Sequence, residues 1–472
     1  MAHELIISVS GLRGIVGESL TPDVARRYAA AFASILPEGP VLISRDGRAN
    51  GGQLVGPVVE GLSQGGSRRV LDAGIAATPT TGILVRHHNC VGGVQISASH
   101  NPAEYNGLKL FSAAGRVVPA DVGRRVQARF EAGAAIESSP VQHSGSAGQS
   151  RHGEFRATSG TPSLADTTSQ HLALVESIVD VRQIRAKKFR VLLDANHGSG
   201  SVLGKPLLEQ LGCHVILLGG TPDGHFAHPP EPTAENLTGV LDEVKRARVK
   251  VGFCQDPDAD RLAIIDENGR YLGEEYTLAL CIDHVLRRTP GPVVTNCSTS
   301  RMAEDLAEKH GVPFYRSAVG EANVVDEMLR RQAVIGGEGN GGVIDPRVGL
   351  VRDSFVGMAL VLDAMAARSA PISKLAAEVP AYAICKTKAE LSADAVPAAL
   401  DALERHFNDA TSDRLDGLRL DWPREGRGDR RGAWLLVRPS NTEPIVRIIA
   451  EALSEEAARR LCDEAAAIVS AV

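Results

Sequence analysis

Three stretches of the sequence share one layout, and they decide the fold: VLISRDGR at Val41–Arg48, VLLDANHGSGS at Val191–Ser201 and VVTNCSTSR at Val293–Arg301. In each stretch an aliphatic, β-branched run predicts a strand, and the polar loop after it leads into a helical pattern. Their starts are separated by lengths of chain typical of a domain. The layout therefore predicts three related α/β domains. The alternative is that any α/β protein repeats a strand followed by a loop.

The sequence around these stretches fits alternating layers of helix and strand. Thr21-Pro22-Asp23 offers an N-cap residue, a proline for the first turn and an acidic side chain for the helix dipole. The helix predicted there precedes the strand at Val41, and similar alternation continues to about residue 370. This alternation indicates an α/β protein.

Beyond residue 370 the pattern changes, which is typical of a separate α+β domain. The strand-like VPAYAICKTKAEL is followed by a helix over 396–407, the two strands WLLVRP and IVRIIAEA, and a closing helix. Residues 137–163 are rich in Ser, Gly and His and predict a linker or mobile excursion. The four predicted domains are 1–150, 151–258, 259–370 and 371–472.

The composition excludes several classes of protein. The 472 residues have a formal net charge of −6, which argues against wholesale binding to nucleic acid or to an acidic membrane surface. The N-terminus lacks the features of a signal peptide, and no apolar run reaches the ~18 residues of a membrane span. The 7 dispersed cysteines form no CxxC pair and fit buried thiols in a reducing compartment. We expect a cytoplasmic protein without nucleic-acid or membrane partners.

The strongest chemical signal is DPDADR at Asp256–Arg261, between the apolar runs VKVGFC and LAIID. Three carboxylates at alternate positions could not be buried unpaired on a strand face, and this density of hard oxygen ligands indicates Mg²⁺ or Ca²⁺. An EF-hand does not fit, because Arg261 stands where its turn needs glycine and the flanks are strand-like. A plain acidic turn is the other alternative. We predict a magnesium loop.

A second segment, ISASHNP at Ile96–Pro102, follows the apolar run VGGVQI. Adjacent Ser99 and His100 rarely form a productive hydrolase pair, and the G-x-S-x-G elbow is absent. Taken alone, the segment predicts a polar turn that leaves Ser99 exposed and approachable.

A third segment, GGEGNGG at Gly336–Gly342, places Glu338 and Asn340 among five glycines. Such an open backbone is either a hairpin turn or a surface that hydrogen-bonds sugar hydroxyls. The chain as a whole contains 48 glycines, above the usual share of about 7%, and glycine is favoured where backbone approaches a ligand closely.

The fourth segment is RPSNTEP at Arg438–Pro444, with Arg447 beyond it. Its fork-shaped cations and short hydroxyl donors match the needs of a phosphate. Ser440-x-x-Glu443 could instead be a capping box, but the strand-like IVRIIA that follows disfavours a helix. We predict a phosphate loop.

Together these segments resemble the α-D-phosphohexomutase superfamily of phosphoglucomutases, phosphomannomutases and phosphoglucosamine mutases. SASHNP resembles its phosphoserine loop, DPDADR its metal loop, GEGNGG its sugar-recognition loop and RPSNTEP its phosphate loop, in the expected order along essentially the whole chain. The metal loop of this family often reads DGDGDR and the phosphate loop SGTEP, differences that leave the chemistry intact. The sugar loop often ends in Ser-Gly-His, where this chain has Asn340-Gly341-Gly342, so the resemblance does not fix the sugar.

The resemblance implies an α/β fold with four domains around a central cleft. Three related α/β domains with mixed sheets would carry the phosphoserine, metal and sugar loops, and a C-terminal α+β domain would carry the phosphate loop. The implied activity is that of an isomerase, an intramolecular phosphotransferase of carbohydrate metabolism that interconverts hexose 6-phosphate and hexose 1-phosphate. Ser99, carried as phosphoserine, would pass its phosphoryl group to the sugar and take back the other one from a hexose 1,6-bisphosphate, which is also the activator.

The resemblance also implies the roles of charged residues. The ligands of Mg²⁺ would be Ser99, through a phosphoserine oxygen, with Asp256, Asp258 and Asp260. Positive charge around the transferring group would come from Arg13, Lys109 and Arg261. Lys109 is also the favoured proton shuttle, because a crowded cationic site lowers a lysine pKa. His100 would orient the serine loop.

The substrate residues follow from the same resemblance. Glu338 and Asn340 would hold ring hydroxyls, Glu338 by paired acceptance. The phosphate that does not react would be held by Arg438, Ser440, Asn441, Thr442 and Arg447. The segments SGLRGIVG, EPTAENL and GEGNGG favour phosphoglucosamine mutase, with phosphomannomutase and phosphoglucomutase as runners-up. A metal-dependent sugar phosphatase and a catalytically silent sugar-phosphate binding protein stay open, and we expect a monomer or a homodimer.

Overall fold

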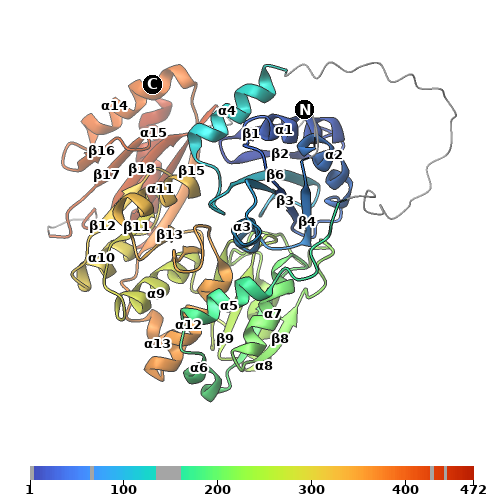
Figure 1. Ribbon diagram of the computed structural model, residues 1–472. Coiled ribbons are helices and arrows are strands. Elements are labelled where there is room, and N and C mark those ends of the chain that lie inside the picture. The colour runs from blue at the N-terminus through green and yellow to red at the C-terminus, as the bar shows by residue number, and fades with distance from the viewer. Residues whose placement is uncertain (1–4, 64–67, 134–160, 426–429, 441–443) are drawn as a thin grey trace.

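The computed structural model describes residues 5–63, 68–133, 161–425, 430–440 and 444–472. The chain folds into four layered units that follow one another in sequence, coloured from blue to red in Figure 1. All but the last three residues of the predicted linker 137–163 lie outside the described residues. Within the described ranges, no helix is long and apolar enough to span a membrane. All seven cysteines are free thiols, and six of them are buried.

The first three units share one strand order, which explains the repeated layout in the sequence. In each unit the strand of the repeated stretch pairs in parallel with two neighbours, and one of these neighbours pairs with a fourth, antiparallel strand. The orders are β4-β3-β5-β6, β8-β7-β9-β10 and β12-β11-β13-β14. The prediction of three related α/β domains with mixed sheets is confirmed.

Unit I adds two antiparallel strands, β2 and β1, beyond β6. Its sheet packs α1, α2 and α4 on one face and α3 on the other. The predicted start of α1 is correct, since Thr21 Oγ1 accepts from the Val24 N–H at 3.3 Å. The elements of unit I are β1 (Ile6–Ser8), β2 (Gly11–Ile15), α1 (Pro22–Ala33), β3 (Val41–Arg45), α2 (Gly52–Leu62), β4 (Val70–Ile75), α3 (Thr78–His87), β5 (Gly92–Ile96), β6 (Tyr105–Ser112) and α4 (Ala120–Glu131).

Unit II places α8 on one face of its four-stranded sheet and α7 on the other. Helices α5 and α6 precede the sheet and pack against a helix of unit III, α12. The elements of unit II are α5 (Ser169–Ser177), α6 (Val181–Lys187), β7 (Arg190–Asp194), α7 (Gly200–Gln210), β8 (His214–Leu218), α8 (Thr238–Ala247), β9 (Val251–Gln255) and β10 (Leu262–Asp266).

Unit III has α11 on one face of its sheet and α9 on the other. Nearly all of α12 is buried, because it packs against α9 and against α5, α6 and α7 of unit II. The largest apolar core therefore runs through units II and III. The elements of unit III are α9 (Glu274–Leu286), β11 (Val293–Asn296), α10 (Met302–Lys309), β12 (Phe314–Ser317), α11 (Glu321–Arg331), β13 (Ile335–Glu338), β14 (Gly342–Ile344), α12 (Ser354–Arg368) and α13 (Ile372–Ala376).

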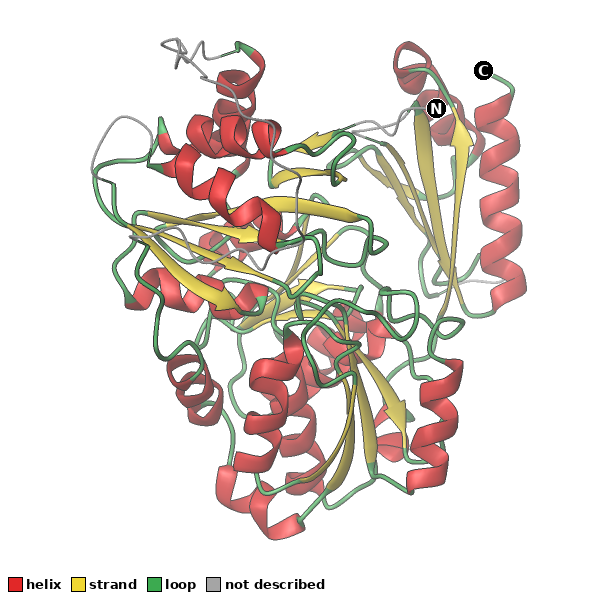
Figure 2. Cartoon of the chain, turned by 90° about the vertical axis from the view of Figure 1, so that its right-hand side faces the viewer, coloured by secondary structure: helices red, strands yellow, loops and turns green. Residues whose placement is uncertain are grey.

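Unit IV is a fully antiparallel sheet in the order β15-β19-β18-β17-β16, as expected for an α+β domain. Helices α14 and α15 cover one face (Figure 2), and on the other face Trp434 and Leu436 pack against Cys297 of unit III. The elements of unit IV are β15 (Ala383–Glu390), the 3₁₀ turn η1 (Ala393–Ala395), α14 (Val396–His406), β16 (Thr411–Asp413), β17 (Leu418–Asp421), β18 (Trp434–Pro439), β19 (Ile445–Ala452) and α15 (Glu455–Ser470).

The predicted domain boundaries stay a prediction, and the sheets refine one of them. The boundary between residues 258 and 259 falls in the turn between β9 and β10, which pair with each other in one sheet. Since a domain keeps its own sheet whole, we propose that this boundary lies after β10.

Candidate active site

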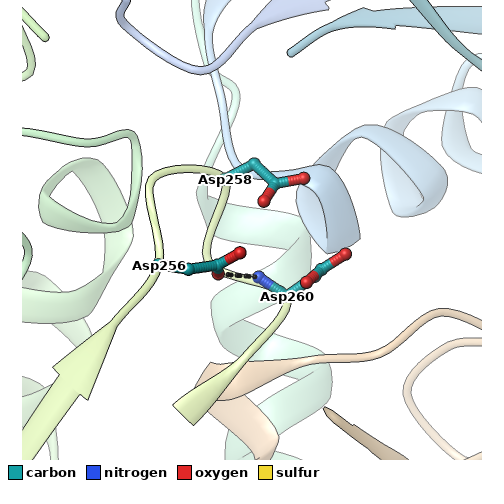
Figure 3. A group of neighbouring side chains, drawn as sticks. All are labelled: Asp256, Asp258 and Asp260. Atoms are coloured by element: carbon teal, nitrogen blue, oxygen red, sulfur yellow. Dashed lines mark hydrogen bonds between the residues drawn. The ribbon is translucent and has the colours of Figure 1, made fainter. Parts of the chain in front are cut away.

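Asp256, Asp258 and Asp260 lie in the loop that joins β9 to β10, so one hairpin presents all three carboxylates (Figure 3). One side-chain oxygen of each lies within 4.8 Å of the others. The backbone N–H groups of Asp260 and Arg261 both donate to Asp256 Oδ1 at 3.1 Å and close the loop. Ala259 has a φ of +55°, in the left-handed region. The loop thus holds three carboxylates in a fixed, tight turn.

Two carboxylate oxygens of this loop accept no hydrogen bond from the described residues. Asp258 Oδ1 and Asp260 Oδ1 are buried, and no group in the described part of the chain hydrogen-bonds to them. A buried, unsatisfied carboxylate oxygen costs free energy, and one hard cation would satisfy both atoms. All-oxygen carboxylate ligands are those that Mg²⁺ prefers. The three aspartates therefore fit the predicted metal.

The pKa values of the three carboxylates diverge because each faces different charges. Burial and the charges of Asp258 and Asp260 raise the pKa of Asp256 well above its ordinary value. Burial also acts to raise the pKa values of Asp258 and Asp260. The positive charge of Lys109 outweighs it at Asp258, and the charges of Arg352 and Lys109 outweigh it at Asp260, so both pKa values are lowered. A bound dication would favour the ionised form of all three.

Ser99 lies in the loop after β5, directly beside the aspartate loop. Its Oγ donates to Asp256 Oδ2 at 2.8 Å, although 157 residues separate the two. Its backbone N–H donates to Ser97 Oγ at 2.9 Å, and its φ of +51° is unusual for a residue other than glycine. The prediction of an exposed serine is wrong, since Ser99 is 2% exposed.

Arg48, to which the sequence assigned no role, holds the backbone of the serine loop. Its guanidinium donates to the carbonyl oxygens of Ser99 and Asn101 at 2.5 and 2.6 Å and of Pro102 and Tyr105 at 2.6 and 3.2 Å. The only sequence signal for this role is the motif RDGR at Arg45–Arg48, which begins in the last residue of β3.

Asp46 orients Arg48 and joins it to the serine loop by a second route. Its Oδ2 accepts from Arg48 Nε at 3.1 Å and from Ser97 Oγ at 2.6 Å. Asp46 is fully buried, and burial raises its pKa in spite of the Arg48 charge. The loop that carries Ser99 is therefore supported by a buried ion pair.

His100 lies against Ser99, with Nδ1 3.4 Å from Ser99 Oγ. Burial, followed by the charges of Arg261 and Arg13, holds the pKa of His100 well below its ordinary value. A lowered pKa favours the neutral ring, which suits the orienting role that the resemblance implies.

Arg13 and Arg261 approach the site from β2 and from the end of the aspartate loop. Arg13 Nη1 donates to Asn101 Oδ1 at 3.2 Å, and burial lowers its pKa. Arg261 is 3.5 Å from Glu231 Oε1 and 4.0 Å from Asp260 Oδ1. Its Nε, the atom nearest to Asp260, is buried and has no hydrogen-bond partner among the described residues.

Lys109, on β6, joins unit I to the aspartate loop of unit II. Its Nζ donates to Asp260 Oδ2 at 2.8 Å and to Asp258 Oδ2 at 3.2 Å. Burial alone would lower the pKa of Lys109, but the charges of these two carboxylates and of Glu321 raise it above its ordinary value. The expected lowering is wrong, because the nearest neighbours of Lys109 are anions and not cations. The role of Lys109 as a proton shuttle stays a prediction.

Arg352, which the sequence did not single out, connects the aspartate loop to the sugar loop. It donates to Asp260 Oδ2 and to Glu338 Oε2, each at 2.6 Å. Glu338, at the end of β13, is 4% exposed, and its Oε1 accepts from Asn296 Nδ2 at 2.7 Å and from the Gly320 N–H at 3.2 Å. A sugar hydroxyl would therefore share the Glu338 oxygens with three protein donors.

Asn340 lies in the turn between β13 and β14, so the sugar loop is also the hairpin that was its alternative interpretation. Asn340 Oδ1 is buried and has no hydrogen-bond partner within the described ranges. A Cβ at the neighbouring Gly339 would lie 2.0 Å from Glu275 Oε1, so a side chain there would displace the Glu275 carboxyl. Burial raises the pKa of Glu275 to about 8. The loop thus offers one free acceptor beside a carboxyl that protonates easily.

The predicted phosphate residues of unit IV lie where β18 and β19 meet. Arg438 and Arg447 are directly opposite each other on these strands. Arg438 Nε donates to Asp416 Oδ2 at 3.0 Å, and the same oxygen accepts from the Val319 N–H of unit III at 2.9 Å. Arg447 is exposed. Two like charges opposite each other are unfavourable unless an anion joins them.

The rest of the predicted phosphate loop is only partly described. The Ser440 N–H donates to the Ile445 carbonyl at 2.9 Å, and β19 begins at Ile445, so a strand rather than a capped helix follows. Asn441 and Thr442 lie outside the described residues.

Family comparisons match all four units in order. The matching models describe the alpha/beta/alpha domains I, II and III of phosphoglucomutase/phosphomannomutase and its C-terminal domain, at residues 5–137, 169–269, 274–382 and 384–468. The resemblance read from the sequence is confirmed.

Individual relatives match along nearly the whole chain. A "Phosphoglucomutase/phosphomannomutase" of Thermococcus kodakarensis is 36% identical over 95% of each chain. A "Probable phosphoglucosamine mutase" of Methanopyrus kandleri is 32% identical over 98% of this chain and 96% of its own. The crystal structure of a phosphoglucomutase/phosphomannomutase family protein from Burkholderia thailandensis has a TM-score of 0.80 at 26% identity, with 99% of this chain and 98% of the other covered. Shared sequence, shared architecture and an intact serine–aspartate centre lead to one conclusion: the protein belongs to the phosphoglucomutase/phosphomannomutase family.

Proposed function

We propose that the protein is a phosphohexomutase that moves a phosphoryl group between O6 and O1 of a hexose, by way of phosphorylated Ser99. In the first transfer, the sugar hydroxyl oxygen forms a bond to phosphorus while the bond between phosphorus and Ser99 Oγ breaks, and the proton of the sugar hydroxyl ends on Ser99 Oγ. The resulting hexose 1,6-bisphosphate reorients by about half a turn within the site. Its other phosphoryl group is then transferred to Ser99. The same bisphosphate acts as activator, because it can phosphorylate enzyme that has lost its phosphate.

The observation that carries this proposal is the position of Ser99. Its Oγ lies 2.8 Å from Asp256, in a loop that contains two unpartnered carboxylate oxygens. Phosphoryl transfer needs positioning and charge stabilisation more than covalent help from the protein. Lys109 and Arg261 supply positive charge at the same place.

We propose Mg²⁺ as the cofactor, held by Asp256, Asp258, Asp260 and an oxygen of phosphorylated Ser99. When bound, this ion stabilises the negative charge of the transferring phosphoryl group. The protein's own residues orient the nucleophile and shield it from water. Arg48 fixes the backbone of the serine loop, and the burial of Ser99 keeps water from a hydrolysable phosphate.

We propose glucosamine phosphate as the preferred sugar, with mannose and glucose phosphates as runners-up. The name of the Methanopyrus kandleri relative supports the first, and that of the Thermococcus kodakarensis relative supports the others. Asn340 Oδ1 is a free acceptor for a sugar hydroxyl or ammonium group, and Glu338 would hold a neighbouring hydroxyl. The non-reacting phosphate is assigned to Arg438, Ser440, Asn441, Thr442 and Arg447.

The substitution Ser99→Ala tests the nucleophile. We expect it to abolish mutase turnover with glucosamine, glucose and mannose 6-phosphates while binding of the sugar phosphates persists, because the change removes only the group that carries the phosphate. A coupled assay of hexose 1-phosphate formation with the three sugars measures turnover and ranks the sugars. Ser34→Ala, which replaces a serine at the end of α1 whose Oγ donates to the Ala31 carbonyl of the same turn, is the control.

Turnover of Ser99→Ala close to that of the wild type would contradict the assignment. The phosphatase alternative predicts release of inorganic phosphate, whereas a mutase releases none and speeds up with trace 1,6-bisphosphate. A catalytically silent binding protein would neither release inorganic phosphate nor form hexose 1-phosphate.

A further inference from the structure

One face of the unit IV sheet carries a row of three cations, Lys388, Arg447 and Arg438, and of these Arg438 alone belongs to the segment RPSNTEP. Strands β15, β19 and β18 are neighbours, and their register places Lys388 opposite Arg447 and Arg447 opposite Arg438. Residues directly opposite each other in antiparallel strands point to the same face. Neighbouring strands are about 4.8 Å apart, so the outer two Cα atoms are separated by about 10 Å. Three positive side chains therefore stand side by side.

This face is not the one that α14 and α15 cover. Trp434 and Leu436 precede Arg438 on the same face of β18, and they pack against Cys297 of unit III. Leu435 and Val437, which alternate with them, belong to the core under the helices. The cation row thus extends the surface that unit IV turns toward unit III.

Lys386 gives independent evidence of that direction. It lies two residues before Lys388 on β15 and so points to the same face. Its positive charge acts on Glu274 and Glu275, at the start of α9 in unit III, and opposes the rise that burial causes in their pKa values. Because Glu275 packs against Gly339 of the sugar loop, this face of β15 looks toward that loop.

The charge of the row is only partly neutralised by the protein. Arg438 has Asp416 as a partner. Lys388 and Arg447 are exposed and form no ion pair with the residues that the structure describes, although Glu390 follows Lys388 on the same face. Adjacent like charges without a counter-charge are unfavourable, and a phosphate dianion would remove the repulsion.

We propose that Lys388 is a third cation of the phosphate-binding face and, with Arg438 and Arg447, holds the non-reacting phosphate of the sugar phosphate. The proposal rests on the proposed function, because it assigns a residue to the ligand of that function. Lys388 belongs to the first strand of unit IV, far in sequence from the phosphate loop. Its role is to bind the phosphate, and the phosphoryl transfer at Ser99 does not involve it.

Binding of glucose 1,6-bisphosphate, measured by calorimetry at low ionic strength, tests the proposal without relying on turnover. We expect Lys388→Gln to raise Kd by about twofold to fivefold, the effect of one exposed charge pair, and Lys388→Arg to restore it. In the mutase assay, Lys388→Gln raises KM by a similar factor and leaves kcat near the wild-type value, because the contact is the same in ground and transition states. The difference between wild type and Lys388→Gln shrinks as salt is added.

Arg459→Gln is the matched control. Arg459 lies on α15, which covers the opposite face of the same sheet, and it is an exposed cation paired with Glu455. Loss of that charge is expected to leave Kd unchanged. The proposal is overturned if Lys388→Gln binds the bisphosphate like the wild type while Arg447→Gln binds it weakly, or if Arg459→Gln weakens binding as much as Lys388→Gln. A wild-type protein that binds no bisphosphate would instead overturn the proposed function, and with it this assignment.

Discussion

Removal of the Arg48 guanidinium is expected to destabilise unit I and to misplace the serine nucleophile. The Arg48 side chain is 1% exposed and makes five hydrogen bonds, one to Asp46 and four to carbonyl oxygens of the serine loop. In Arg48→Met the apolar volume is largely kept, but the fully buried Asp46 loses its cation. Breaking a buried ion pair costs about 3–5 kcal/mol. Solvent screening does not reduce this figure, because both partners are buried.

Two measurements separate the stabilising role of Arg48 from its positioning role. Urea denaturation gives the free energy of unfolding, which we expect to fall by about 4 kcal/mol in Arg48→Met. Adding Asp46→Asn to this variant is expected to recover part of the loss, because the unpaired charge is then gone. In the mutase assay, kcat falls by at least about tenfold while KM changes little, since Arg48 holds the loop of Ser99 and not the substrate.

The control is Arg125→Met, which removes an exposed arginine of α4 in the same unit. The reasoning would be refuted if Arg48→Met lost no more than about 0.5 kcal/mol, as an ordinary surface substitution does. A large loss of stability with unchanged kcat would refute the positioning role alone.

Metal binding and pH dependence can be tested in unit II. Asp258→Asn is expected to lower Mg²⁺-dependent turnover by about a hundredfold or more, measured by adding Mg²⁺ back after chelation. Asp242→Asn, which changes an exposed acid of α8, is the control. An equal loss of turnover in both variants would contradict the ligand assignment. His228 Nε2 lies 2.7 Å from Asp194 Oδ2, and although burial lowers its pKa, this partner raises it to a net value above the ordinary one. Because the folded pKa is the higher one, the stabilisation is complete below the unfolded pKa of about 6.5 and is lost as pH rises through the folded pKa. The free energy of unfolding should therefore fall more between pH 6 and pH 8 in the wild type than in His228→Gln. The same fall in both proteins would show that the His228–Asp194 pair does not contribute to stability.

The parts that could be predicted from the sequence are those written in short stretches of chain. The strand–loop–helix pattern is local, so the three α/β units and the change to an α+β unit are readable from hydrophobic periodicity. The aspartate loop is equally local, because three carboxylates within five residues leave few structural alternatives. Ser99 could be named only through its resemblance to a family loop.

The roles of Arg48 and Arg352 could not be predicted, because they depend on contacts between distant segments. Arg48 and Arg352 are two of many arginines, and only the fold shows that one holds the serine loop and the other joins Asp260 to Glu338. The pKa of Lys109 was predicted with the wrong sign for the same reason, since its neighbours Asp258 and Asp260 come from another unit. Lys388 becomes a candidate only through strand register.

The hydrogen bonds at the centre also bear on how the chain acquires activity as it folds. Ser99 reaches Asp256 across 157 residues, Lys109 reaches Asp258 across 149, and Arg352 reaches Asp260 across 92. Contacts of such long range form late, after local structure and after individual units have collapsed. A refolding chain should therefore recover its helical signal before it recovers turnover. Catalysis belongs to the docked assembly of units, and no single unit could perform it alone.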